Sequence, residues 1–262
     1  MKTMPTAFKT ITIAVTSLLL FAGAALAAEI HVMNSGGFSA AYRALAPEFE
    51  AATKNVLVTA WGPSMGTTPE AIPNRLARGE PADVLIMVGD ALDELIKRGK
   101  AVAGSRVDLA GSKIGMVVRA GAPKPDISTV EAFKRALVNA KSIAYSDSAS
   151  GVYLSTVLFQ RLGIADQIAG KSKMIPAEPV GAVVARGDAE LGFQQISELL
   201  PVPGIELVGP LPPEIQKVTV FAAGIAVGAK QPEAGGQLIK FMSSPAAAPA
   251  IIKSGLEPMT SR

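Results

Sequence analysis

Three times in its first half, the chain runs through a short apolar segment, a polar or glycine-rich turn and a segment with helical spacing of apolar residues. The apolar segments are residues 29–34, 56–60 and 82–87. This order predicts βα units, whose strands form a mainly parallel sheet flanked by helices. Ligands of such sheets bind at the carboxyl ends of the strands, which is where the polar turns lie.

The same pattern returns after residue 112, and a long apolar strand at residues 218–227 follows late in the chain. We therefore expect an α/β protein of two lobes, with the chain crossing between them near residues 112–118 and again near 218–227. Lobe 1 would comprise residues 28–111 and 228–262, and lobe 2 residues 112–227. A cleft between two such lobes is the usual place for a small ligand.

Residues 1–27 have the features of a signal peptide. Lys2 and Lys9 give a basic start, residues 11–28 are uncharged and mostly apolar, and Ala25-Leu26-Ala27 has the pattern of a cleavage site. An uncleaved membrane anchor is the alternative, because the run is just long enough to span a bilayer. The small residues at its end favour cleavage. We therefore expect an exported, soluble protein, which lies in the periplasm where the host has two membranes.

The composition excludes several kinds of chemistry. The chain carries 25 basic and 22 acidic residues, two of the basic ones in the leader, and no basic block with interleaved aromatics that would suggest nucleic acid. It has no cysteine, so thiolate nucleophiles, disulfides and cysteine metal sites are ruled out. The single histidine, His31, cannot form a histidine cluster for a metal. We expect neither a metal nor a cofactor.

A hydroxyl-rich turn joins the strand that ends near Tyr145 to the next helix. Ser146, Ser148 and Ser150 lie in this turn, and Gly151 follows them. The start of a helix attracts anions, because its free N–H groups and the positive end of its dipole point the same way. Plain N-capping by serine and aspartate is the alternative explanation.

The chain resembles the type II periplasmic binding proteins, in particular the molybdate-binding branch, over nearly the whole mature sequence. The resemblance implies a two-lobe hinge fold that closes over a small oxyanion held by hydroxyls and backbone N–H groups. The spans that carry it are Val32-Met33-Asn34-Ser35-Gly36-Gly37, Ala60-Trp61-Gly62-Pro63-Ser64, Arg78-Gly79-Glu80-Pro81-Ala82-Asp83-Val84, Ser150-Gly151-Val152-Tyr153, Pro176-Ala177-Glu178-Pro179-Val180 and Leu191-Gly192-Phe193.

The ligand positions of that branch are only partly kept. By this resemblance, the serine of the first turn falls at Gly37, and the serine of the second turn is kept as Ser64 or replaced by Met65. The helix-start position falls at Ser150, and Val180 keeps the aliphatic position whose backbone N–H is used. These departures indicate a ligand other than molybdate.

Amides and a guanidinium would suit a carboxylate ligand. The tyrosine that ends the late strand in the family becomes Gln195, and the Gln194-Gln195 pair can donate to carboxylates. Arg75 could add a bidentate contact, or could lie on a solvated helix face. The complete set of predicted ligand-binding residues is Ser35, Gly36, Gly37, Ser64, Met65, Arg75, Ser148, Ser150, Gly151, Val180, Gln194 and Gln195.

The chain as a whole also resembles the aconitate isomerases, enzymes built on this frame. Such an enzyme can shift a double bond by removing a methylene proton and returning a proton at the other end of the allylic system. Asp147 or Glu178 could be the base, and Tyr145 or Tyr153 could return the proton. The alternative is a monomeric binding protein that delivers a tricarboxylate or a molybdate-like oxyanion to an ABC permease.

Overall fold

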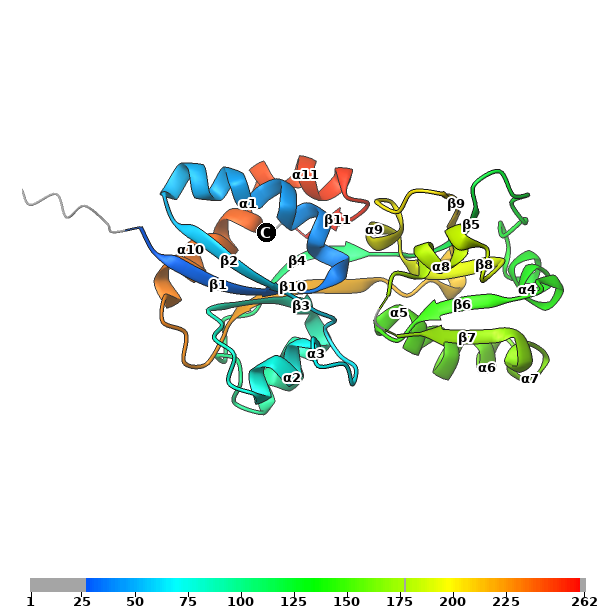
Figure 1. The fold of residues 1–262 in the computed structure, drawn as a ribbon, viewed down its shortest axis with the longest axis horizontal. Coiled ribbons are helices and arrows are strands. Elements are labelled where there is room, and N and C mark those ends of the chain that lie inside the picture. The colour runs from blue at the N-terminus through cyan, green and yellow to red at the C-terminus, as the bar shows by residue number, and fades with distance from the viewer. Residues whose placement is uncertain (1–26, 177, 260–262) are drawn as a thin grey trace, which may run out of the picture.

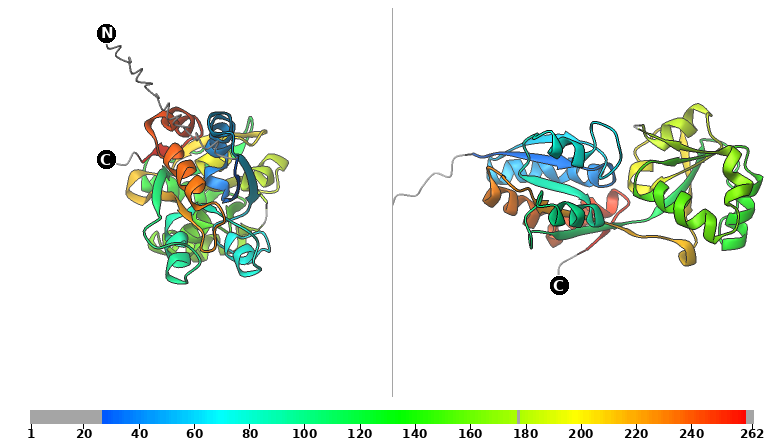
Figure 2. Two further views of the ribbon diagram at one scale, coloured as in Figure 1. Left: turned by 90° about the vertical axis from the view of Figure 1, so that its left-hand side faces the viewer. Right: turned by 90° about the horizontal axis from the view of Figure 1, so that it is seen from below.

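The computed structural model describes residues 27–176 and 178–259, so that nearly all of the predicted signal peptide lies outside the described residues. The molecule consists of two α/β lobes, joined by extended segments (Figures 1 and 2). In the described part of the chain, one sheet has six strands and the other has five. This arrangement confirms the predicted two-lobe α/β class.

The first lobe is built on the six-stranded sheet, in the order β11-β4-β10-β3-β1-β2. β1 pairs in parallel with β2 and β3, whereas β10 runs antiparallel to β3 and β4. Its strands are β1 (Glu29–Asn34), β2 (Val56–Trp61), β3 (Val84–Val88), β4 (Val107–Ser112), β10 (Thr219–Ile225) and β11 (Glu257–Pro258).

The second lobe is built on the five-stranded sheet, in the order β7-β6-β8-β5-β9. β6 pairs in parallel with β7 and β8, whereas β5 runs antiparallel to β8 and β9. Its strands are β5 (Ile114–Arg119), β6 (Ile143–Ser146), β7 (Ser172–Ile175), β8 (Leu191–Gln195) and β9 (Ile205–Pro210).

Helices cover both faces of the first sheet. α1, α10 and α11 lie on one face, and α2 and α3 lie on the other (Figure 1). Successive residues of β3 point to these two faces in turn, because Ile86 belongs to the core under α1 and Leu85 to the core under α3. The helices are α1 (Ser39–Thr53), α2 (Ile72–Ala77), α3 (Gly89–Lys97), α10 (Pro232–Met242) and α11 (Ala248–Lys253), with the short turns η1 (Gly36–Phe38) and η5 (Pro245–Ala247).

The second sheet is also covered on both faces. Phe133 of α4 meets Phe193 of β8 edge-on on one face, and Val183 and Val184 of α8 pack against the other. Its helical segments are α4 (Val130–Asn139), α5 (Ala149–Tyr153), η2 (Leu154–Leu158), α6 (Phe159–Arg161), α7 (Ala165–Ile168), η3 (Ala169–Lys171), α8 (Val180–Arg186), α9 (Ile196–Leu199) and η4 (Pro213–Ile215).

Both sheets are mixed, since β10 and β5 each run antiparallel to two neighbours, but they remain mainly parallel as predicted: β1, β2, β3 and β4 share one direction in the first sheet, and β6, β7, β8 and β9 share one in the second. Two details differ from the sequence predictions. β10 pairs within the first sheet, although its residues fall in the range expected for lobe 2. The helix after β6 begins at Ala149, with the extended Ser148 as its N-cap, so that Ser150 lies inside the helix rather than in the turn before it. Among the described residues, no helix combines the length and apolar character needed to cross a bilayer.

The two lobes also touch near the crossings. The Ser197 hydroxyl of α9 donates to the carbonyl oxygen of Gly37 at 2.7 Å, and the Gln195 amide donates to the Thr219 hydroxyl at 2.9 Å. These contacts hold the carboxyl ends of β1 and β8 against each other. The turns that follow those strands therefore face one another.

Candidate functional site

A cleft of about 360 Å³ lies between the facing turns of the two lobes. The first lobe lines it with the β1–α1 turn, α1 and the end of β2, and the second lobe with the β6–α5 turn, the start of α8 and β8–α9. Its lining residues are Asn34, Ser35, Gly36, Ser39, Arg43, Trp61, Gly62, Pro63, Ser146, Asp147, Ser148, Glu178, Pro179, Gln194 and Glu198. The cleft thus lies where parallel strands end, as the βα pattern predicts.

A chain of hydrogen bonds forms the first wall. The Val88 N–H donates to the Ser64 hydroxyl at 2.9 Å, and the Ser64 hydroxyl donates to the Ser35 hydroxyl at 2.7 Å. Ser64 is fully buried, and Ser35 lines the cleft. Because Ser35 accepts a hydrogen bond from Ser64, its own O–H remains available to a ligand in the cleft.

A second serine pair forms the opposite wall. The Ser146 and Ser150 hydroxyls lie 3.0 Å apart, and Ser146 lines the cleft while Ser150 is buried behind it. A Cβ built at Gly151 would overlap the carbonyl oxygen of Ser146. Gly151 therefore allows α5 to pack directly against the end of β6, and Ser150 supports Ser146 rather than lining the cleft itself.

Asn34, at the carboxyl end of β1, was not predicted as a site residue. Asn34 is among the residues that surround the cleft and is 0% exposed, yet neither its amide nitrogen nor its amide oxygen has a hydrogen-bond partner among the described residues. An unpartnered buried polar group costs about 1–3 kcal/mol. A ligand carboxylate would supply the acceptor that the amide nitrogen lacks.

Arg43 was also missed, and it supplies a cation to the cleft. Its guanidinium lies 4.1 Å from the centre of the Trp61 ring, and Trp61 in turn meets Tyr42 edge-on. Arg43 forms no ion pair within the described part of the chain. The aromatic ring thus positions a guanidinium that is available to a carboxylate.

Arg75, the predicted carboxylate ligand, lies outside the cleft lining. Its guanidinium pairs with Glu80 at 2.7 Å and donates to the carbonyl oxygens of Glu70 and Trp61 at 3.0 and 3.2 Å. These contacts tie the loop after β2 to α2. Arg75 therefore has its hydrogen-bonding capacity engaged within the first lobe.

Three carboxyl groups line the cleft. Glu178 is exposed and pairs with Arg186 through both of its oxygens, at 3.0 and 3.3 Å. Burial raises the pKa of Asp147 above its ordinary value. Burial also raises the pKa of Glu198 to about 7; the Asp147 charge acts in the same direction, and a hydrogen bond from Gln194 opposes the shift. Glu198 was not among the predicted residues.

The other predicted residues divide between the cleft and its support. The Val180 N–H donates to the Gln194 side-chain oxygen at 3.0 Å, so an internal amide occupies the backbone donor that was predicted to bind the ligand. The Tyr145 ring packs against Phe159, 5.9 Å between centres. Predicted residues that line the cleft are Ser35, Gly36, Asp147, Ser148, Glu178 and Gln194; those outside the lining are Gly37, Ser64, Met65, Arg75, Tyr145, Ser150, Gly151, Val180 and Gln195.

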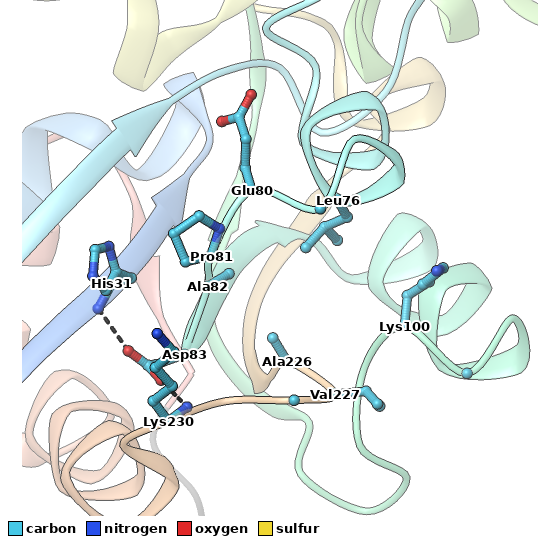
Figure 3. Close-up of a pocket in the computed structure, with 13 residues that line it drawn as sticks. His31, Leu76, Glu80, Pro81, Ala82, Asp83, Lys100, Ala226, Val227 and Lys230 are labelled. Atoms are coloured by element: carbon cyan, nitrogen blue, oxygen red, sulfur yellow. Dashed lines mark hydrogen bonds between the residues drawn. The ribbon is translucent and has the colours of Figure 1, made fainter.

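A larger cavity, of about 510 Å³, lies beside the start of β3 and the end of β10 in the first lobe (Figure 3). There the Asp83 carboxylate accepts N–H groups from His31 at 2.8 Å, Lys230 at 2.6 Å and Gln231 at 2.8 Å. The His31 ring points away from the cleft and lies 3.1 Å from Glu29. Asp83 thus fastens the loop after β10 to β1, which is a structural role. Within the described residues, no group of three or more histidine, aspartate or glutamate side chains could hold a metal ion.

Comparison with known proteins agrees with this architecture. Residues 30–257 match the bacterial extracellular solute-binding proteins, and the chain belongs to this family. It is 53% identical over 252 residues to an aconitate isomerase of a Pseudomonas species, covering 95% of this chain and 96% of that protein. It is 31% identical over 192 residues to the molybdate-binding protein ModA of Azotobacter vinelandii, covering 69% of each chain.

The fold is also that of a solved molybdate-binding protein. The periplasmic molybdate-binding protein of Azotobacter vinelandii superposes with a TM-score of 0.68 at 22% identity, over 87% of this chain and 98% of that one. The predicted molybdate-binding-protein-like fold is therefore confirmed.

Proposed function

We propose that this protein is an aconitate isomerase, which interconverts trans- and cis-aconitate in the cleft between its lobes. The observation that carries the proposal is the 53% identity, over nearly the full length of both chains, with a relative named aconitate isomerase. The cleft supports it, because its donors suit carboxylates better than a compact tetrahedral oxyanion. The predicted leader and the family's extracellular description support a periplasmic location.

The substrate carries three carboxylates, and the cleft offers donors on both walls. Arg43 provides a guanidinium that can pair with a carboxylate, Ser35 and Ser146 provide hydroxyls, and Asn34 provides an amide. Charge-assisted hydrogen bonds of this kind are the strong ones. Donors that hold the carboxylates also stabilise the negative charge that spreads onto them once a methylene proton is removed.

The reaction is a proton shift along an allylic system. A base removes a proton from the methylene carbon, and the released electron pair forms a double bond to the central carbon. The electrons of the former double bond take a proton at the far carbon. Atoms and charge balance without any oxidant or co-substrate. The candidate bases in the cleft are Asp147, Glu178 and Glu198.

Purified protein mixed with trans-aconitate tests the proposal. We expect cis-aconitate to accumulate until the equilibrium ratio is reached, and the same ratio to be reached from the cis side, as followed by proton NMR. Tight binding of aconitate or molybdate without turnover would instead identify a binding component of an importer, which is the second candidate function. The ModA relative and the shared fold favour that candidate over any other non-catalytic function.

A further inference from the structure

Glu198 lies where the second lobe meets the first. It belongs to α9, which follows β8 directly, and its neighbour Ser197 donates to the Gly37 carbonyl oxygen at 2.7 Å across the lobe boundary. A Cβ built at Gly36 would overlap Glu198 Oε1, so the carboxyl reaches the backbone of the opposite turn. Glu198 therefore belongs to the second lobe and packs against a turn of the first, where the two lobes line the cleft.

The surroundings of Glu198 contain charges of both signs, but within the described residues none of them pairs with it. Arg43 stacks on Trp61, Glu178 pairs with Arg186, and the charge that acts on Glu198 is that of Asp147. Burial and this like charge raise the pKa of Glu198 to about 7. A carboxyl that is half ionised near neutrality can both accept and return a proton.

The Gln194 side chain acts on the same carboxyl. A backbone N–H can only donate, so the contact from Val180 fixes the Gln194 oxygen on that side and leaves the amide N–H groups free of it. The effect of Gln194 is to lower the pKa of Glu198, which means that its amide favours the ionised carboxylate.

The other candidate groups are less well placed for this role. Both oxygens of Glu178 are taken by Arg186, and its side chain is exposed. Tyr145 lies outside the cleft lining, and the Tyr153 hydroxyl donates to the Ile215 carbonyl oxygen at 3.0 Å. Asp147 lines the cleft but lies in the turn of one lobe only.

Resting on the isomerase function proposed above, we propose that Glu198 is the residue that carries the proton between the two ends of the allylic system. Its carboxylate removes a proton from the methylene carbon, and the C–H electron pair becomes the new double bond. The protonated Glu198 then gives its proton to the far carbon, whose electrons come from the former double bond. The carboxylate is restored, and one group serves both steps on one face of the substrate.

The test compares the wild-type protein with Glu198→Gln in D₂O. The amide keeps the size of the side chain and cannot take up the proton, so we expect kcat to fall by about 10²–10⁴-fold. Any deuterium that the wild-type protein incorporates, by exchange of the Glu198 proton with solvent between the two steps, should be lost in parallel. The dissociation constant for trans-aconitate should stay within about threefold or become tighter, because a charge of the same sign as the substrate is removed. Glu131→Gln, an exposed carboxyl on α4, is the matched control and should behave as wild type.

The outcomes distinguish the role of Glu198 from the isomerase function on which it rests. A Glu198→Gln variant that keeps turnover within tenfold of an active wild-type protein overturns the role of Glu198 and leaves the isomerase function standing. Absence of turnover and exchange in the wild type overturns the isomerase function itself. If Glu198→Gln does not fold, Glu198→Asp decides: we expect at least a tenfold lower kcat at unchanged affinity, and an unchanged kcat contradicts the proposal.

Discussion

The Ser64 hydroxyl donates to the Ser35 hydroxyl at 2.7 Å, so a fully buried side chain sets the direction of one that lines the cleft. Ser64 is in turn held by the Val88 N–H at 2.9 Å. The three groups form a line from the core of the first lobe to the cleft. A residue that lies outside the lining thereby influences ligand binding.

Ser64→Ala should weaken aconitate binding about three- to tenfold. The Ser35 hydroxyl loses the hydrogen bond that it accepts from Ser64, so its own O–H can rotate away from the cleft. The weaker binding corresponds to about 1 kcal/mol, the usual value of one hydrogen bond. Isothermal titration calorimetry measures the change. Ser254→Ala is the control, since Ser254 is a buried serine of the same lobe that donates to the Ile251 carbonyl oxygen at 2.7 Å and lies outside the cleft lining. Equal losses in both variants would contradict the relay.

Arg43→Lys should raise KM for trans-aconitate about tenfold or more, because an ammonium cannot offer a planar bidentate contact and stacks less well on Trp61. Arg75→Lys is the informative comparison. Its partners all lie within the first lobe, so it should lower the melting temperature while leaving KM within about twofold. A raised KM in Arg75→Lys, together with an unchanged KM in Arg43→Lys, would instead identify Arg75 as the carboxylate ligand.

The pH profile of kcat/KM should rise with pH through about 7, because Glu198 must be ionised to accept a proton and its pKa is raised to about 7. Asp147→Asn removes the like charge and should move this acid limb to lower pH. Steady-state rates measured in constant-ionic-strength buffers between about pH 5 and 9 test the shift. If the acid limb of the kcat/KM profile has the same midpoint in Asp147→Asn as in the wild type, the titrating group is not Glu198.

Stability should depend on the same carboxyl. Since its pKa is about 7 in the folded protein and lower in the unfolded chain, the folded state binds the proton more tightly. Wild-type stability is therefore lost as the pH rises from the ordinary glutamate range to about 7, and the loss is complete above it. Glu198→Gln lacks this loss. Relative to wild type it should gain about 1–3 kcal/mol between pH 5 and pH 8, measured by urea unfolding.

Gly36→Ala should lower kcat by at least tenfold, because the new methyl group overlaps Glu198 Oε1 and displaces the carboxyl. Gly236→Ala is the matched control. Gly236 lies exposed in α10 with no heavy atom near the position of an added Cβ, so the change should leave activity intact and stabilise the helix slightly. Similar activity in the two variants would show that the carboxyl need not approach the Gly36 backbone.

Much of the fold follows from local sequence patterns, and the elements that these patterns do not predict depend on contacts between distant parts of the chain. β3 is a continuous apolar run, β8 begins with the apolar segment Leu191-Gly192-Phe193, and the helices between them have clear spacing, so these elements are predicted nearly in place. β4, with the sequence Val107-Asp108-Leu109-Ala110-Gly111-Ser112, contains residues of low strand propensity. It becomes a strand because β10 and β11 pair with its two edges, which no local pattern reveals.

The site was predicted less completely than the fold. The turns that carry Ser35, Ser148 and Gln194 were identified because hydroxyls and amides follow apolar strands. Arg43 and Glu198 are far apart in sequence, and each lies on a helix where a charged residue usually faces solvent. Only the docking of α9 on the first lobe brings them to one cleft, and only the packed structure shows that Asn34 lacks a partner among the described residues.

The contact between the Val180 N–H and the Gln194 side chain has a consequence for ligand discrimination. The Gln194 amide already stands where the binding-protein relatives are expected to receive an oxygen of their anion. A small tetrahedral oxyanion would have to compete with a group tethered to the same lobe, at a very high local concentration. A flat tricarboxylate that reaches Arg43 and the two serine walls need not displace it. The Gln194 side chain thus competes with a small oxyanion for the Val180 N–H and leaves the longer tricarboxylate unaffected.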